Sequence, residues 1–218
     1  MRASWTIGAA AFALGACAYL PVSPAPKEAN ASPPIAEQPG WPRVGSTWTL
    51  AQETTGSFSG ASGEIRSRAL GPQDWSGRKV MAVESGENVW YFDDKKRTVA
   101  QMRAGKPVAT YDPGEAVYEW PLAVGRAWQA KYRYLNHPTG QSTDVQFDVR
   151  VEGYEKLTTP AGTFDTYRIS MTSPTAVLTR WYSPKLGILI KDRFERTAAN
   201  RLGADTRESI LKSQDIEP

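Results

Sequence analysis

Residues 144–194 alternate between apolar and polar side chains, and this pattern limits what the chain can fold into. In residues 145–152 every odd position is apolar and every even position is polar. Side chains of a β-strand point to opposite faces in turn, so this period of two predicts a strand that is buried on one face. The alternation resumes at residues 167–171, after Thr159-Pro-Ala-Gly-Thr163, whose proline and glycine suit a hairpin turn. The stretch therefore predicts antiparallel strands joined by short turns.

Shorter alternating runs predict further strands on both sides of this stretch. The expected strands are residues 47–54, 64–70, 78–85, 88–93, 97–103, 106–111, 128–134, 145–152, 167–171, 177–182, 186–194 and 206–215. Turns are expected where glycine and proline gather, at 56–63, 71–72, 85–86, 104–105 and 112–114. Outside the N-terminal segment, no part of the chain keeps a helical period for three turns. The fold class is therefore all-β, with antiparallel meanders forming a curled sheet, a sandwich, or an open or closed barrel.

Two parts of the chain repeat one pattern. The residues that follow Trp41 and Trp120 both read Trp-Pro, then Val-Gly-x-x-Trp, and both lead into an alternating strand. A Trp-Tyr pair comes later in each part, at Trp90 and at Trp181. Chance agreement in a tryptophan-rich chain is the alternative to a duplication. We interpret the two parts as related halves of one domain, residues 41–112 and residues 120–194.

The first sixteen residues have the layout of an export signal, with the single charge of Arg2 followed by a largely apolar run. The run ends in Leu14-Gly-Ala-Cys17, which resembles the lipobox of bacterial lipoproteins. That resemblance implies cleavage before Cys17 and acylation of this cysteine with chains such as palmitate, which anchor a protein to a membrane. Ala18, the next residue, implies sorting to the periplasmic face of the outer membrane. An ordinary signal peptide with a cysteine near its end is the alternative.

Residues 17–40 are expected to form a disordered tether behind the lipidated cysteine. Prolines occur at positions 21, 24, 26, 33, 34 and 39, and neither a helical nor a strand period is present. Such a segment cannot bury enough apolar surface to fold. The folded part is accordingly expected to be a single β domain that spans residues 41–218.

Two short motifs in the second half resemble a pattern found in uncharacterised bacterial envelope proteins. In that group an alternating strand leads to Pro-Ala-Gly-Thr-Phe, here residues 160–164, and a later strand carries Trp-Tyr-x-Pro-x-x-Gly, here residues 181–187. The resemblance implies an all-β periplasmic domain or lipoprotein of unknown function, and it carries over no catalytic residue. The residues themselves suggest structural roles, in which Pro160 and Gly162 set a turn, Phe164 covers one end of the core and Gly187 ends a second turn.

The composition argues against several classes of chemistry. The single histidine, His137, lies in a turn sequence, and no serine in a nucleophile-elbow context accompanies it. One histidine and one cysteine cannot form a metal site of the His/Cys type, and no phosphate-binding glycine loop precedes a helix, so no cofactor is expected. Without residues 1–16, 25 basic residues face 23 acidic ones, from totals of 26 and 23, which argues against nucleic acid. A hydrolase that uses carboxylates alone remains open.

The aromatic residues are the remaining candidates for a site. Trp48, Trp90, Trp128, Tyr132 and Trp181 are candidates to line a cavity or groove for an acyl chain or another apolar ligand. Packing within a β-sheet core is the alternative for the same residues. Three hypotheses follow: a membrane-anchored module that binds a lipophilic ligand or an envelope partner; a structural or assembly lipoprotein with a packed core that docks a partner through a sheet edge or loop face; and a carboxylate-only hydrolase. A non-enzymatic role is favoured.

Overall fold

The computed structural model describes residues 33–55 and 62–216, so Cys17, the export signal and most of the expected tether lie outside the described residues. Over the described residues the chain forms twelve β-strands, which confirms the all-β prediction. The strands are β1 (Thr47–Thr55), β2 (Gly63–Trp75), β3 (Arg78–Ser85), β4 (Asn88–Phe92), β5 (Thr98–Arg103), β6 (Lys106–Glu115), β7 (Ala127–Asn136), β8 (Gln141–Thr159), β9 (Gly162–Ser173), β10 (Ala176–Ser183), β11 (Ile188–Arg196) and β12 (Asp205–Asp215). Among these residues no helix has the length and apolar composition needed to cross a membrane.

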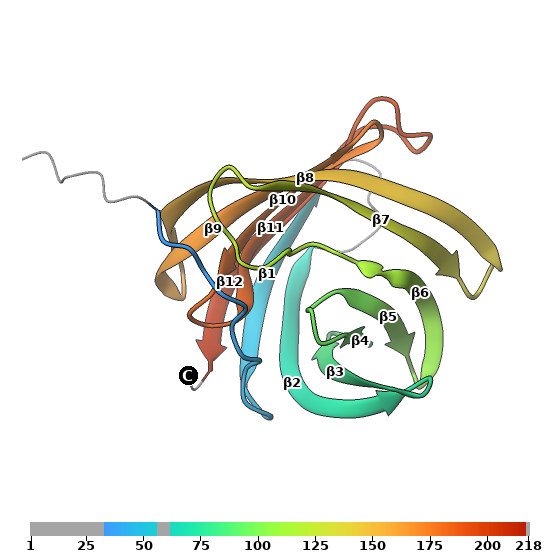
Figure 1. Ribbon diagram of the computed structural model, residues 1–218, viewed down its shortest axis with the longest axis horizontal. Coiled ribbons are helices and arrows are strands. Elements are labelled where there is room, and N and C mark those ends of the chain that lie inside the picture. The colour runs from blue at the N-terminus through green and yellow to red at the C-terminus, as the bar shows by residue number, and fades with distance from the viewer. Residues whose placement is uncertain (1–32, 56–61, 217–218) are drawn as a thin grey trace, which may run out of the picture. The chain divides into compact units, whose positions relative to one another are not determined.

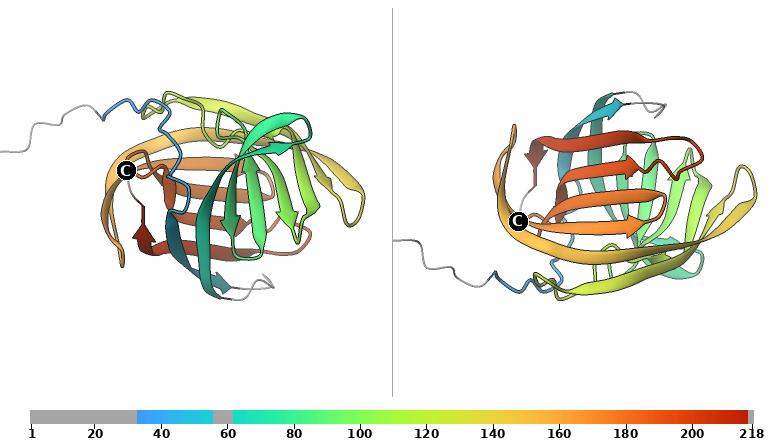
Figure 2. Two further views of the ribbon diagram at one scale, coloured as in Figure 1. Left: turned by 90° about the horizontal axis from the view of Figure 1, so that it is seen from below. Right: turned by 90° about the horizontal axis from the view of Figure 1, so that it is seen from above.

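The strands form one closed antiparallel barrel. Each strand pairs with its neighbours in the chain, and β1 pairs with both β2 and β12, which closes the sheet on itself. Figure 1 shows the sheet curling from β1 round to β12, and Figure 2 shows the barrel from two opposite sides. Closure satisfies backbone groups that an open sheet would leave at its first and last strands. Of the expected architectures, the chain therefore adopts the closed barrel.

Two of the expected turns lie inside strands. Gly71-Pro72 was expected to end a strand, but β2 continues through it to Trp75 with a bulge between Ala69 and Gly71. A bulge accommodates a glycine with positive φ and a proline without an N–H, so the sequence signal for a turn was misleading here. The 112–114 junction likewise belongs to the end of β6, which pairs with β5 through Glu115.

Matched backbone features occur in the two segments interpreted as related halves, of which residues 41–112 contain β1–β5 and most of β6, and residues 120–194 contain β7–β10 and most of β11. Gly45 and Gly125, the glycines of the two Val-Gly sequences, have φ values of 92° and 88°. The N–H of Gly45 donates to the carbonyl oxygen of Ala69 at 2.9 Å, and that of Gly125 donates to Val151 at 2.9 Å. A bulge follows each of these acceptors in its strand. Gly45 and Gly125 thus belong to equivalent turns, and each turn is hydrogen-bonded to the second strand of its own segment, β2 or β8.

The two Trp-Tyr sequences are matched in the same way, because Trp90 lies in β4 and Trp181 in β10, the fourth strand of each half. Six residues after each tryptophan, the chain takes a left-handed conformation, at Lys96 with φ 59° and at Gly187 with φ 71°. Gly187 therefore ends its turn as the sequence predicted. Lys96 holds the equivalent place in the first half, where a glycine would carry less strain.

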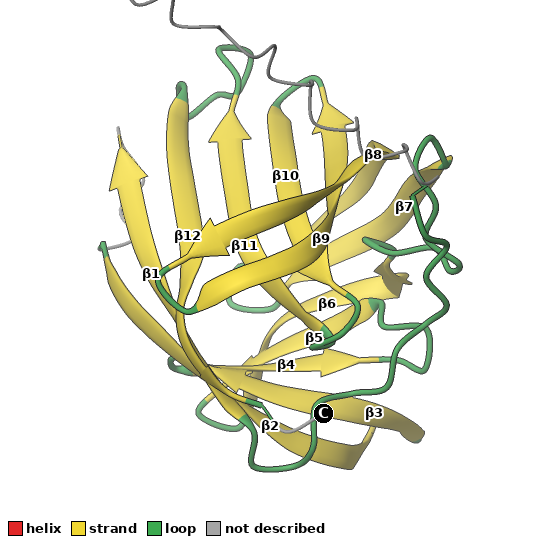
Figure 3. Ribbon diagram, turned by 90° about the vertical axis from the view of Figure 1, so that its left-hand side faces the viewer, coloured by secondary structure: helices red, strands yellow, loops and turns green. Residues whose placement is uncertain are grey.

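Among the described residues, buried apolar side chains form a larger and a smaller core cluster. The larger core lies mainly in the second half and consists of Val117, Leu122, Ala130, Tyr132, Phe147, Val149, Val151, Tyr167, Ile169, Met171, Ala176, Leu178 and Tyr182. The smaller core consists of Trp48, Ala69, Val83, Ile188, Ile190, Leu211 and Ile216. Phe164 packs against the smaller core from the β8–β9 hairpin, as expected for a residue that covers one end. Figure 3 shows this hairpin extending past β10 across β11 and β12.

The residues that precede β1 lie against the barrel, and we call residues 33–46 the N-terminal strap. Ala36 and Leu122 exchange two backbone hydrogen bonds, at 2.9 and 2.8 Å. The Tyr167 hydroxyl donates to the carbonyl oxygen of Pro34. Residues 33–40 were expected to belong to the disordered tether, but these contacts show that Pro34 and Ala36 lie against the barrel. The pattern of apolar residues could not predict that the strap contacts the barrel, because most of these contacts use backbone groups, which every residue carries.

Candidate functional site

The inward face of β10 and β11 contains an ion pair among apolar residues. Arg180 follows Leu178 on that face, and Asp192 follows Ile190. The Nε of Arg180 donates to Oδ1 of Asp192 at 3.1 Å, with side chains that are 17% and 14% exposed. Burial opposes the charge of Arg180, but Asp192 and Glu115 outweigh that effect and raise the pKa of the guanidinium. Arg180 is therefore charged at every physiological pH.

Tyrosines from β6 and β7 lie near this ion pair. The hydroxyl of Tyr132 donates to Oε1 of Glu115 at 3.0 Å. Tyr111 contacts the rings of Tyr132 and Tyr134, with 5.6 Å between centroids in each case. Burial, followed by the charge of Glu115, raises the pKa of Tyr132 and keeps its hydroxyl protonated. Because these charged and hydroxyl groups are already paired with one another, the arrangement stabilises the interior more readily than it binds a charged ligand.

Lys96 is a second buried cation, and only 4% of its surface is exposed. Its ammonium donates to the carbonyl oxygen of Gly40 at 3.0 Å and lies 3.5 Å from the hydroxyl of Tyr182. It also lies 4.1 Å from the ring centroid of Trp41. Burial lowers the pKa of Lys96 to about 8. Its contacts with Gly40 and Trp41 hold the N-terminal strap on the barrel.

The candidate aromatic residues do not converge on one cavity. Trp128 and Tyr132 both pack in the larger core, where the indole N–H of Trp128 donates to Ala116 at 3.0 Å. Trp48 belongs to the smaller core. Trp90 lies half-buried on β4, opposite residues of β3 and β5. The structure therefore brings together only two of the candidates among these four.

Trp181, the fifth candidate, points to the other face of β10 from Arg180 and Tyr182. Its indole N–H donates to Oε1 of Glu155 at 2.7 Å, and the ammonium of Lys191 lies 5.2 Å from its ring centroid. The pairing of β10 with β11 is irregular at this point, but the extra residue is Ile190 of β11, so the alternation along β10 continues. Counting residues along β10 therefore places Trp181 on the face opposite Tyr182.

A groove of about 530 Å³ lies where the two motifs and the strap meet, and we call it the hairpin groove. It is formed by the strap, the β8–β9 hairpin, the turn between β10 and β11, and the end of β12. Pro34, Phe164 and Leu186 contribute apolar surface, and the lining residues are Pro34, Ala36, Tyr154, Thr163, Phe164, Asp165, Tyr167, Ser183, Pro184, Lys185, Leu186 and Gln214. The motif residues that the sequence explained as turn formers thus also line a surface groove.

The hairpin groove also has polar side chains, which belong to Tyr154, Thr163, Asp165, Tyr167, Ser183, Lys185 and Gln214. Asp165, the carboxylate of its lining, pairs with Lys156 at 2.8 Å on the neighbouring strand. Tyr154 and Tyr167 stack with 4.9 Å between their centroids. Lys185 lies in the β10–β11 turn, and the described residues offer it no carboxylate within ion-pair distance. The groove therefore combines apolar walls with a positive charge at its rim.

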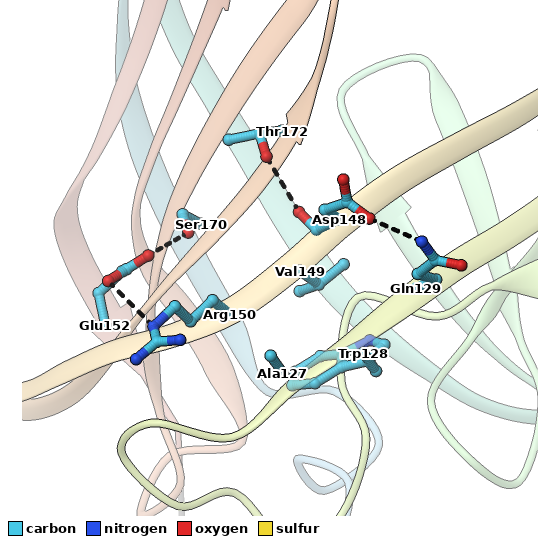
Figure 4. A pocket seen from close by; sticks show the side chains of 9 residues that line it. All are labelled: Ala127, Trp128, Gln129, Asp148, Val149, Arg150, Glu152, Ser170 and Thr172. Carbon is cyan, nitrogen blue, oxygen red and sulfur yellow. Dashed lines mark hydrogen bonds and ion pairs between the residues drawn. The ribbon is translucent and has the colours of Figure 1, made fainter.

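A second, shallower depression lies on the outside of β7, β8 and β9 (Figure 4). Its polar side chains bind one another: Gln129 donates to Asp148 at 3.0 Å, and Ser170 donates to Glu152 at 2.7 Å. These contacts are the cross-strand pairs expected on the solvent face of a sheet. The hairpin groove is accordingly the better candidate for a binding site.

Catalytic and metal chemistry finds little support in the described residues. They contain no group of three or more histidine, cysteine, aspartate or glutamate side chains arranged to hold a metal ion. His137 is in an exposed turn, 3.3 Å from the hydroxyl of Thr110. The carboxylate of Asp93 accepts from the backbone N–H groups of Lys95 and Arg97 and pairs with the Arg97 side chain at 2.6 Å, so it stabilises the turn between β4 and β5.

The hairpin groove could not be predicted from the sequence, because its lining comes from four separate parts of the chain. Arg180 and Asp192 could have been found, since each replaces an apolar residue at an inward position of an alternating strand. A charged residue at such a position indicates a buried ion pair.

Comparisons with known proteins add no assignment of function. No protein-family model matches the chain, and no curated protein matches it. Solved structures that resemble it include a candidate lipoprotein from Parabacteroides distasonis, with 15% identity, a TM-score of 0.42, and coverage of 83% of this chain and 99% of that one. A candidate exported protein with a YmcC-like fold from Bacteroides fragilis has 15% identity, a TM-score of 0.41 and the same coverage. The hypothetical lipoprotein YmcC from Escherichia coli has 12% identity, a TM-score of 0.40, and coverage of 77% of this chain and 86% of that one.

Proposed function

We propose that this chain is a lipid-anchored protein of the bacterial cell envelope whose barrel binds an apolar segment of a partner protein in the hairpin groove. One observation carries the proposal. The two motifs at residues 160–164 and 181–187 meet at this groove, together with the strap that leads back toward Cys17. Binding sites are commonly concave surfaces that combine apolar walls with polar groups that fix the orientation of the ligand.

The anchor is tested by replacing Cys17 with serine. Serine has no thiol to accept an acyl chain, so the variant is expected in the soluble periplasmic fraction and without labelled palmitate. The wild-type chain should be labelled and sediment with the outer membrane. Labelling of the Cys17→Ser variant would overturn the lipobox assignment. Sedimentation of the wild-type chain with the inner membrane would overturn only the proposed location at the outer membrane.

Binding in the groove is tested by photo-crosslinking in living cells. A photoreactive residue at Leu186, in the groove wall, is expected to form a discrete crosslink with an envelope protein. The same residue at Gln129, in the outer depression, is the matched control and should form none. No crosslink at Leu186, or the same products from both positions, would contradict the proposal.

A lipophilic ligand is the second candidate, because Pro34, Phe164 and Leu186 could also contact an acyl chain. Native mass spectrometry of the Cys17→Ser chain distinguishes the two. A near-stoichiometric extra mass that organic solvent removes, and that a Leu186→Arg variant lacks, would identify a lipophilic ligand. A protein mass without such an addition agrees with a protein partner.

A further inference from the structure

The edge of β9 is incompletely paired beside the hairpin groove. β9 begins at Gly162, but its pairing with β10 extends only from Tyr167 to Ser173. Residues 162–166 pair with β8 on one side, and among the described residues no strand pairs with their other side. This free edge borders the groove, because Thr163, Phe164 and Asp165 belong to the groove lining.

Two hairpins independently determine which backbone groups point away from β8. Thr159 and Gly162 close a two-residue turn and therefore form a hydrogen-bonded pair. Hydrogen-bonded and non-bonded pairs alternate along an antiparallel ladder, so Thr163 and Asp165 direct their N–H and C=O groups away from β8. Ser173 and Ala176 close the β9–β10 turn, and counting back from them gives the same assignment. Two donors and two acceptors are thus aligned along the free edge.

The walls of the groove suit the side chains of a strand placed on this edge. Phe164 and Leu186 offer apolar contacts, and a strand presents every second side chain to one face. Lys185 offers a positive charge at the rim, whereas the nearby carboxylate of Asp165 is neutralised by Lys156 at 2.8 Å. Charge complementarity therefore favours an acidic residue in the occupant.

We propose that the apolar segment of the partner binds in an extended conformation, adds a strand to residues 163–165 of β9, and carries an acidic residue that faces Lys185. Main-chain hydrogen bonds along a sheet edge supply affinity, and pockets for alternate side chains supply selectivity. This inference rests on the proposed function, in which the hairpin groove is the binding site. It adds the conformation and the charge of the bound segment.

The test uses the Cys17→Ser chain and a fluorescent probe peptide in which glutamate precedes alternating valine and threonine. Two further versions carry N-methyl groups on the odd or on the even residues, so that only one version loses the N–H groups that face β9. One of the two should bind at least about tenfold more weakly, because two hydrogen bonds are lost, and the other should bind like the parent peptide. Fluorescence anisotropy measures all three affinities.

A charge exchange tests whether Lys185 contacts the acidic residue of the bound peptide. Lys185→Glu should weaken the binding of the acidic probe by about threefold to tenfold and should strengthen binding of a probe with lysine in place of glutamate. Lys131→Glu, on the outer face of β7, is the matched control and should change neither affinity.

Equal effects of the two N-methyl patterns would overturn strand addition, and so would the absence of saturable binding by the parent probe up to about 1 mM. A discrete crosslink from Leu186 together with either of these results would leave the proposed function standing and would refute the extended conformation alone. Absence of both the crosslink and probe binding would refute both proposals.

Discussion

Lys96 should make the protein more stable at alkaline pH. Burial lowers the pKa of Lys96 from 10.5 to about 8 in the folded protein, whereas the unfolded chain keeps the ordinary value. Between these two values the unfolded state binds more protons than the folded state, so raising the pH favours folding. From pH 7 to pH 9.5 the free energy of unfolding should rise by about 2 kcal/mol through this group.

The assay is urea denaturation of the Cys17→Ser chain at several pH values from 7 to 9.5, with and without Lys96→Met. Tyrosines of the unfolded chain begin to ionise toward the top of this range, since their ordinary pKa is about 10, but they do so equally in both proteins. The variant keeps the length of the side chain and has no proton to lose, so its stability should change less over the range. The difference between the two proteins isolates the contribution of Lys96.

Equal pH dependence in the two proteins would refute the reasoning. It would mean that Lys96 remains charged when the protein is folded, with the ammonium hydrated rather than enclosed by Gly40, Trp41 and Tyr182. If Lys96 made the protein less stable between pH 7 and 9.5, the predicted direction of its pKa shift would be wrong, because such a loss requires a pKa above 10.5 in the folded state.

Two further substitutions test the packing of the barrel by urea denaturation. Gly187→Ala should cost about 2–3 kcal/mol, because its φ is +71° and a Cβ would lie 3.0 Å from the carbonyl oxygen of Gly40. Gly140→Ala, with φ +67° and no atom within 4 Å of a Cβ, should cost only about 1 kcal/mol, and equal costs would contradict the close approach. Asp192→Ala should cost about 3 kcal/mol by leaving Arg180 without its partner, whereas adding Arg180→Met should recover part of that loss. A double variant as unstable as the sum of the two single variants would show that the pair is not coupled.

The sequence predicted the fold class and most strands because alternation is a local property of a half-buried strand. The meander of residues 144–194 corresponds to β8–β11, with β8 longer than expected. The Gly71-Pro72 turn was predicted wrongly because the same residues suit a bulge as well as a turn. The inward assignment of Trp181 failed because Trp181 and Tyr182 are adjacent in β10 and so point to opposite faces of the sheet, and Tyr182 is the buried one.

The pattern of alternating residues by itself determined that the chain is all-β and antiparallel, and the repeated Trp and Val-Gly positions indicated its two halves. Only the tertiary structure decided that β1 pairs with β12, that the strap lies on the barrel, and that the strap, residues 163–167, 183–186 and Gln214 form one groove. The physical reason is that alternation reports which face of a strand is buried, whereas closure and the groove depend on contacts between residues far apart in the chain. Several of those contacts use backbone groups, which leave no mark in the sequence.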